Sequence, residues 1–265
     1  MTPICDMHMH STNSFDGKHT FEQMCSAAAQ RGIQAIALTE HLDFDDKGEY
    51  QPYFYENQDK IKAAFKNAPP LPQTLLYGIE IGGPNFQPDM FEQVIAGHDP
   101  DFVLGSVHLF KDMQDIYYVK YTKENYRYYL DLYFETAIEM ATFGGFDVLA
   151  HLDYPLRYMK HCFPGQPTFA GYDMHIFKLF KILIEKGIGL EINTKSLRCT
   201  GQLLEPFVLK MYKEMGGKHL TLGSDAHTAA EIGNGIIEAQ KQAKDCGFDY
   251  VCIYKKRTPV FLKLS

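Results

Sequence analysis

The sequence predicts an α/β protein in which parallel strands close into a barrel surrounded by helices. Short apolar runs alternate with longer amphipathic stretches along the chain, which is typical of βαβ units and a parallel sheet. Seven or eight such units follow one another, and this number favours a closed barrel over an open sheet. The 265 residues show no internal repeat, low-complexity tract or change of composition. Residues 1–265 are therefore expected to form a single domain.

The expected strands are short apolar runs, and the expected helices are longer. The strands lie at 3–10, 33–39, 74–81, 102–107, 147–151, 188–194 and 219–224, with a weaker candidate at 250–254. The helices lie at 20–31, 54–67, 88–96, 123–143, 172–186, 203–215 and 229–246. Glycine follows most of these helices, as it often does where a helix ends and the chain reverses. The segment 155–171 contains three prolines and two glycines, which predicts a long loop after the fifth strand.

Composition and charge argue against several classes of function. The net charge is -7 at pH 7, so we expect no broad basic surface for a nucleic-acid backbone. No apolar run reaches about 18 residues, and the first residues lack the features of a secretory signal, so no membrane association is expected. The six cysteines form no C-x-x-C pair and are interpreted as reduced thiols. A cytoplasmic enzyme acting on a small molecule fits these observations. The tyrosines between 117 and 133 fit either internal packing or a contact in a homo-oligomer.

Histidine and carboxylate residues lie at the ends of six predicted strands. Asp6, His8 and His10 alternate along the first strand, so all three are expected on one face, with Met7 and Met9 on the other. The other strand ends carry Glu40, His41, Glu80, His108, His151, Asp225 and His227. Because all strands of a parallel barrel point the same way, these side chains are expected to converge on the rim where barrel enzymes carry their active sites.

A single histidine at a strand end usually caps the strand or faces solvent, but six such ends need another explanation. Burying so many imidazole and carboxylate groups together would cost desolvation energy at each of them. Divalent metal ions satisfy all of them at once, because these groups are ligands of zinc, manganese and iron. The sequence therefore predicts a metal centre at the carboxyl ends of the strands.

The same residues form motifs that resemble those of the polymerase and histidinol phosphatase (PHP) superfamily. The motifs are Asp6-Met-His-Met-His-Ser11 with Ser14-Phe-Asp-Gly17, Thr39-Glu-His41, Gly78-Ile-Glu80, Gly105-Ser-Val-His108, Ala150-His151 and Gly223-Ser-Asp-Ala-His227. Two further features, Glu191-Ile-Asn-Thr194 and Arg198, resemble the histidinol-phosphatase branch. The resemblance spans nearly the whole chain, and the motifs occur in the family's order.

This resemblance implies a distorted (β/α)7 barrel of the TIM-like PHP type that holds two or three divalent metal ions, Zn, Mn or Fe. The ligands carried over residue by residue form three groups. They are His8, His10, Glu80 and Asp225 for the first metal, Glu80 as a bridge with His108 and His151 for the second, and Asp16, His41 and His227 for the third. A competent residue occupies every ligand position, which argues against an inactive member of the family.

The implied reaction is hydrolysis of a phosphate ester by a metal-bound hydroxide. Two metals about 3.5–4 Å apart activate a water molecule and clamp the phosphate oxygens. The sequence has no G-x-S-x-G elbow for a serine nucleophile and no P-loop for nucleotide hydrolysis. Arg198 and Arg157 are candidate catalytic residues, because arginine binds phosphate with a bidentate fork, although Arg198 at the surface is the alternative. Glu191 and Asn193 share one face of the sixth strand and either orient metal ligands or fill the barrel.

The resemblance indicates L-histidinol phosphate as the substrate, hydrolysed to L-histidinol and phosphate in histidine biosynthesis. The ammonium and imidazole of this substrate would need acceptors, and Asp112, Asp115 and Asp153 lie on the expected rim loops. Three alternatives stay open. They are a PHP-type phosphodiesterase or exonuclease, a phosphatase of another small phosphoester, and a metal-binding domain without turnover.

Overall fold

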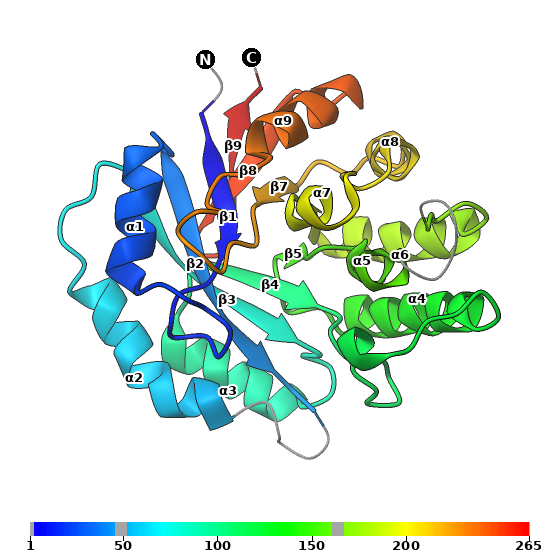
Figure 1. The fold of residues 1–265 in the computed structure, drawn as a ribbon, viewed down its shortest axis with the longest axis horizontal. Helices are drawn as coiled ribbons and strands as arrows, with labels where there is room; N and C mark the ends of the chain where they lie inside the picture. Colours follow the sequence, from blue (N-terminus) through cyan, green and yellow to red (C-terminus); the bar gives the residue numbers. More distant parts are fainter. Residues whose placement is uncertain (1–2, 46–51, 161–166, 265) are drawn as a thin grey trace.

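Seven parallel strands form the central sheet, in the order in which they occur along the chain (Figure 1). The computed structural model describes residues 3–45, 52–160 and 167–264. The strands are β1 (Cys5–Met9), β2 (Ala35–Asp43), β3 (Thr74–Gly82), β4 (Phe102–Ser106), β5 (Val148–Leu149), β6 (Gly189–Asn193) and β7 (Leu220–Gly223). Each strand pairs in parallel with the next one along the chain.

The first and last strands of this sheet meet, so the sheet is a nearly closed barrel. The backbone carbonyl of His8 accepts a hydrogen bond from the amide of Asp225 at 2.7 Å, and the amide of His10 donates to the carbonyl of Ala226 at 2.9 Å. Both contacts lie just past the end of β7, so the barrel closes at the carboxyl ends of its strands. The predicted distorted (β/α)7 barrel is confirmed.

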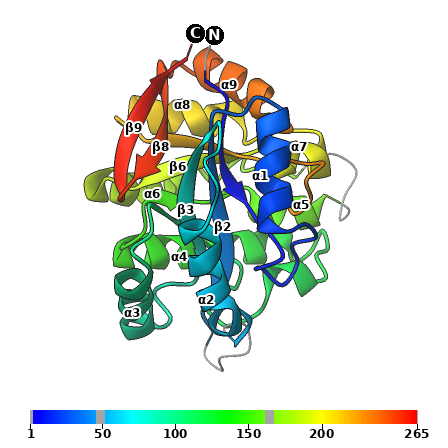
Figure 2. The ribbon, with the colours of Figure 1, turned by 90° about the vertical axis from the view of Figure 1, so that its left-hand side faces the viewer.

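Helices surround the barrel on its outer side (Figures 1 and 2). They are α1 (Phe21–Gln30), α2 (Pro52–Lys66), α3 (Pro88–His98), the 3-10 helix η1 (Ile116–Tyr118), α4 (Tyr126–Phe143), α5 (Tyr154–Met159), α6 (Asp173–Lys186), α7 (Lys195–Thr200), α8 (Pro206–Glu214) and α9 (Ile236–Asp245). Local chemistry explains several ends: Thr20 and Gln23 form a capping box at α1, and Gly187 ends α6 in a left-handed conformation. Within the described residues, no helix is both long and apolar enough to cross a bilayer.

A β-hairpin closes the amino end of the barrel. The weak strand predicted at 250–254 is real, but as β8 (Tyr250–Lys255) it pairs antiparallel with β9 (Thr258–Lys263), outside the barrel sheet. Cys252, Ile253 and Tyr254 pack against the apolar side chains inside the barrel. Nε of Arg257, in the hairpin turn, lies 2.6 Å from Oδ2 of Asp147, just before β5. With apolar groups filling this end, the polar residues are left at the opposite end.

A β-bulge in β1 changes the face on which its polar residues lie. Asp6 pairs with Ile36 and Met9 pairs with Leu38, so three residues of advance along β1 correspond to two along β2. The predicted alternation, with Asp6, His8 and His10 on one face, is therefore wrong. Asp6 accepts backbone hydrogen bonds from Ser224 and Gly233 at 2.8 Å, whereas His8 and His10 face the interior of the barrel. Bulges beside functional sites often redirect side chains in this way.

Two short helices at the carboxyl end of the barrel differ from the sequence prediction. The segment 155–171, predicted as a long loop, starts with α5 instead, while its residues 161–166 lie outside the described part of the chain. Helix α7, which the sequence did not predict, begins two residues after β6 and packs against α5. Each has only six residues, which is too short for an amphipathic period to stand out in the sequence.

Candidate metal centre

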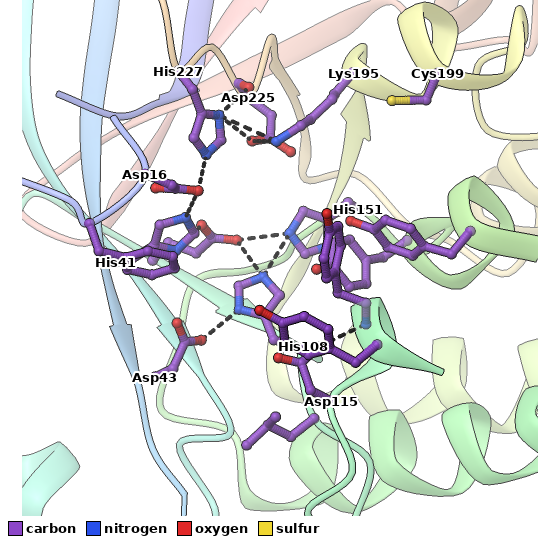
Figure 3. A pocket seen from close by; sticks show the side chains of 17 residues that line it. Asp16, His41, Asp43, His108, Asp115, His151, Lys195, Cys199, Asp225 and His227 are labelled. Atoms are coloured by element: carbon purple, nitrogen blue, oxygen red, sulfur yellow. Dashed lines mark hydrogen bonds and ion pairs between the residues drawn. The ribbon is translucent and has the colours of Figure 1, made fainter. Parts of the chain in front are cut away.

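The carboxyl ends of the strands surround a cavity of about 560 Å³ (Figure 3). Seven of the nine predicted metal ligands line it, and the other two, His8 and His10, lie buried beneath its floor. The complete lining is Phe15, Asp16, His41, Asp43, Glu80, His108, Leu109, Asp115, Tyr117, Tyr118, His151, Tyr154, Tyr158, Lys195, Cys199, Asp225 and His227. The fold thus brings all nine predicted residues to one place.

The first group lies at the floor of the cavity. Nε2 of His8 lies 3.1 Å from Nε2 of His10 and 3.2 Å from Oε2 of Glu80. Nε2 of His10 lies 3.7 Å from Oδ1 of Asp225. Two imidazole nitrogens that bind one zinc ion at about 2.0–2.1 Å in tetrahedral geometry lie roughly 3.3 Å apart. The separations in this group therefore match those of ligands that share one ion.

The second group uses the other oxygen of Glu80. Oε1 of Glu80 lies 2.8 Å from Nε2 of His151 and 3.3 Å from Nε2 of His108. The two imidazole nitrogens are 3.4 Å apart, again the spacing of two ligands of one ion. The hydroxyl of Ser106, at the end of β4, donates to the same Oε1 at 2.6 Å and orients it. Glu80 thus faces two groups of histidines with two different oxygens, which is the arrangement of a bridging carboxylate.

The third group is the most exposed and lies between β2 and the segment after β7. Oδ2 of Asp16 lies 2.7 Å from Nε2 of His227 and 3.6 Å from Nε2 of His41. The ring of His41 stacks on that of His10, with centroids 4.1 Å apart, so this group adjoins the first one. His10, His41 and His227 also bring ligand nitrogens within 4.8 Å of one another.

Several buried polar atoms of this centre have no hydrogen-bond partner among the described residues. They are Oε2 of Glu80, Nδ1 of His41, Oδ1 of Asp16 and Nδ1 of His151. Oε2 of Glu80 and Nδ1 of His41 lie 3.0 Å apart, but their geometry is not that of a hydrogen bond. A buried polar atom without a partner costs about 1–3 kcal/mol, and a cation bound by Oε2 of Glu80 and another bound by Asp16 would remove that cost for these carboxylate oxygens. The side chains therefore fit bound metal ions.

Burial and neighbouring charges, Glu80 among them, shift the pKa values of the histidines in opposite directions. Burial alone would raise the pKa of Glu80, but the surrounding histidines hold that pKa well below the ordinary value. Burial lowers the pKa of His151 to about 4. Burial acts in the same direction on His108, but Asp43 and Glu80 outweigh it and raise that pKa to about 10. A metal ion held by His108 would have to displace a proton from this ring, so its binding would release protons.

Glu191 holds two of the predicted ligands from below. Its Oε1 lies 2.8 Å from Nδ1 of His8, and its Oε2 accepts the backbone amide of His151 at 2.8 Å. The side-chain amide of Asn193 donates to the same carboxylate at 3.0 Å. A Cβ on Gly223 would lie 2.2 Å from Oε1 of Glu191, so only glycine leaves room here. These contacts favour ligand orientation over mere filling of the barrel for Glu191 and Asn193.

Asp43 is a site residue that the sequence motifs did not reveal. Its Oδ1 lies 2.5 Å from Nδ1 of His108, which directs Nε2 of the ring toward Glu80. A Cβ on Gly82 would lie 1.8 Å from this Oδ1, so the glycine makes the contact possible. One signal could have found it: Asp43 lies two residues after His41 in the same strand, and such residues share a face.

Asp43→Asn is expected to weaken metal binding at the His108 position about 10–100-fold, as is usual when a carboxylate behind a histidine ligand is lost. Competition with a chromophoric chelator measures the affinity, and kcat/KM should fall with it. Asp112→Asn is a matched control, because the Asp112 side chain caps a turn at residue 114 away from the cavity. Wild-type metal affinity in Asp43→Asn would contradict the assigned role.

The segment that carries Asp16 is fixed by a buried carboxylate of β2. Glu40 accepts hydrogen bonds from the hydroxyls of Ser11 and Ser14, each at 2.5 Å, and from the amide of Ser11. Glu40 does not line the cavity. His41 therefore reaches the candidate metal centre, whereas its neighbour Glu40 stabilises the turn that carries Asp16.

The two predicted arginines lie behind Asp225. Nη1 of Arg157 forms a buried ion pair with Oδ2 of Asp225 at 3.0 Å. Arg198 donates from Nη2 to the backbone carbonyl of Asp225 at 3.4 Å and lies 3.9 Å from Glu231. Neither arginine lines the cavity, whereas Lys195 does. Asp225 has a φ of 51°, a conformation that costs a non-glycine residue energy, and these contacts hold it there.

Four tyrosines and one carboxylate face the cavity beside the metal-binding groups. The tyrosines are Tyr117, Tyr118, Tyr154 and Tyr158, and the ring of Tyr154 lies 4.8 Å from that of His151. Among the three carboxylates considered for the substrate amine, Asp115 lines the cavity. Asp153 is buried, and burial raises its pKa although Arg157 nearby acts in the opposite direction. Asp112 lies in its turn outside the lining.

Known proteins are similar to this chain over most of its length. The family model described as "PHP domain" matches residues 6–195. A probable histidinol-phosphatase of Thermotoga maritima is 30% identical over 256 residues, which cover 96% of this chain and 97% of the relative. A probable histidinol-phosphatase of Clostridium acetobutylicum is 28% identical and covers 96% and 98% of the two chains.

A solved structure is similar over almost the same length. It is the crystal structure of histidinol phosphate phosphatase from Lactococcus lactis, complexed with zinc, L-histidinol and phosphate. The TM-score is 0.78 at 26% sequence identity, and the match covers 97% of this chain and 98% of that one. Together with the family match over residues 6–195, these findings show that the chain belongs to the PHP domain family.

Proposed function

We propose that this chain is a metal-dependent phosphomonoesterase that hydrolyses L-histidinol phosphate to L-histidinol and phosphate. One observation carries the proposal. Several groups of histidine and carboxylate side chains, each close enough to hold a metal ion, share one cavity. The related enzyme from Lactococcus lactis was solved with zinc, L-histidinol and phosphate, which supports the same chemistry for this chain.

The proposed metal content is two to three divalent ions, zinc, manganese or iron, because a mixed set of imidazole and carboxylate donors suits these metals. The proposed ligands are His8, His10, Glu80 and Asp225 for one ion, Glu80, His108 and His151 for the second, and Asp16, His41 and His227 for the third. Such ions, when bound, lower the pKa of a water molecule and neutralise the charge of phosphate oxygens.

The protein supports this chemistry through side chains that hold the ligands in place. Asp43 orients the ring of His108, so that its Nε2 faces the cavity. Arg157 engages Oδ2 of Asp225 and leaves Oδ1 directed toward the histidines. Arg198 has a buried Nη1 without a hydrogen-bond partner among the described residues, and we propose it as a phosphate contact at the rim. Ligands held in this way need no rearrangement when the substrate binds.

The histidinol part of the substrate carries an ammonium and an imidazole, and the cavity offers groups for both. Asp115 and four tyrosines line the same cavity as the metal-binding groups. A carboxylate pairs with an ammonium, and an aromatic ring attracts a cation or stacks on an imidazole. We assign the histidinol moiety to this wall of the cavity.

The proposal predicts a kcat/KM for histidinol phosphate well over tenfold above that for p-nitrophenyl phosphate or glycerol phosphate. Polar groups that pair with the amine and ring of histidinol stay unpaired when a simpler ester binds, and this opposes the wrong substrate. Initial rates of phosphate release give the ratio. A preference below tenfold, worth about 1.4 kcal/mol, would refute the assignment to histidinol phosphate. Cleavage of dinucleotides in place of monoesters would favour the phosphodiesterase alternative.

The same proposal places the enzyme in the cytoplasm, as part of histidine biosynthesis. Cys5, Cys25, Cys246 and Cys252 are buried free thiols, a state that a reducing compartment preserves. The net charge of -7 favours a small phosphoester over a nucleic acid as the substrate.

A further inference from the structure

The cavity carries a lysine that none of the sequence motifs includes. Lys195 is the first residue of α7, so its side chain starts at the carboxyl end of the barrel. Nζ lies 3.1 Å from Oδ1 of Asp225 and 3.3 Å from Nδ1 of His227, and Figure 3 shows the side chain pointing toward both. Among the described residues that line the cavity, it is the sole lysine or arginine.

Lys195 is not the sole cation beside Asp225. Arg157 already pairs with Oδ2 of Asp225 in a fully buried contact. The oxygen near Lys195 is Oδ1, which also lies 3.7 Å from Nε2 of His10 and belongs to the group proposed to hold a metal ion. A metal ion bound by Oδ1 would compete with the Lys195 ammonium for this oxygen. The ammonium would then keep hydrogen-bond donors that can face the cavity.

We infer that Lys195 binds a phosphoryl oxygen of the substrate, an inference that rests on the proposed function. An ammonium is a compact cation with three donors on a flexible stem, and this side chain is 29% exposed. It can therefore turn from Asp225 toward an incoming phosphate without a change in the backbone. Arg198, proposed above as a phosphate contact at the rim, lies outside the cavity lining, so Lys195 is a second cation that meets the phosphate from within the cavity.

Lys195→Met tests the inference through binding of inorganic phosphate to the metal-loaded enzyme. The dissociation constant of phosphate, measured by calorimetry and as product inhibition, is expected to rise about 10–100-fold, as is common for loss of a charged hydrogen bond. KM should rise more than kcat falls. Bound metal per chain, measured by elemental analysis, should stay at the wild-type value. Lys195→Arg keeps the charge and is expected to restore most of the affinity.

Lys160→Met is the matched control, because Lys160 donates to the carbonyl of Cys199 and does not line the cavity. Wild-type phosphate affinity in Lys195→Met would overturn the inference. Loss of metal from this variant would also overturn it, since the lysine would then hold the ligands of the metal centre. Failure of the proposed function is a different result: the wild type itself would neither hydrolyse phosphomonoesters nor bind phosphate.

Discussion

Glu80→Ala is expected to lower kcat/KM by about 1,000-fold or more and to release most of the bound metal. Its two oxygens lie within 3.3 Å of Nε2 of His8, His108 and His151, and within 3.0 Å of Nδ1 of His41. Glu191 also contacts His8 and His151, but through Nδ1 of His8 and the backbone amide of His151, whereas Glu80 meets Nε2 of both rings. In the proposed centre, removal of Glu80 would take a ligand from two ions at once, and it leaves buried imidazoles without a counter-charge. A loss of about 4 kcal/mol in transition-state stabilisation corresponds to the expected factor.

Elemental analysis and steady-state kinetics on the purified variant check this result. Glu80→Gln keeps the shape of the side chain but loses the charge. A similar defect in this variant would show that the loss comes from weaker metal binding and not from the space left by a smaller side chain. Glu92→Ala, at an exposed position of α3, controls for the loss of a carboxylate elsewhere. An active, metal-loaded Glu80→Ala enzyme would contradict the bridging role.

Chelation is expected to abolish phosphatase activity and to lower the melting temperature by about 10 °C. Ligands that bind only the folded state stabilise it by about 4 kcal/mol at 1,000 times their dissociation constant, and about 1 kcal/mol shifts the melting temperature by 2–4 °C in a chain of this size.

The measurement compares the protein purified without chelator, the chelated protein, and the chelated protein after addition of zinc, manganese or iron. We expect two to three metal ions per chain in the first sample and recovered activity in the last. Full activity in a preparation with only trace metal would rule out the metal-dependent mechanism. The metal that restores the highest kcat/KM identifies the preferred ion.

Much of the candidate site could be predicted because all strands of a parallel barrel point in the same direction. His108 and His151 follow apolar runs, and Glu80 ends another, so a parallel barrel must bring them to the same rim. The family motifs then connected these positions into groups. In the structure their ligand atoms lie close together, but the triads that come within 4.8 Å of one another, such as His8, Glu80 and His151 or His10, His41 and His227, divide the residues differently. That these residues bind metal in the proposed grouping stays a prediction that the experiments above test.

Other features depend on contacts between segments far apart in the sequence. The pattern of β1 predicts one face for Asp6 and His8, but pairing with β2 introduces a bulge that separates them. Asp43 acquires its role because β2 runs beside β3 and Gly82 leaves room for its carboxylate. Such effects depend on which strand is the neighbour, so a local pattern cannot reveal them.

By itself, the sequence determined the barrel, the order of its seven strands, and the rim at which histidines and carboxylates gather. These follow from periodicity and strand polarity, which are properties of each segment. The tertiary structure alone decided that β8 leaves the barrel to form a hairpin at its amino end, and that Arg157 and Arg198 lie behind Asp225 while Lys195 reaches the cavity. The reason is physical: the direction of a side chain at a cavity depends on how short, irregular segments such as α7 pack, and that packing energy comes from residues distant in the chain.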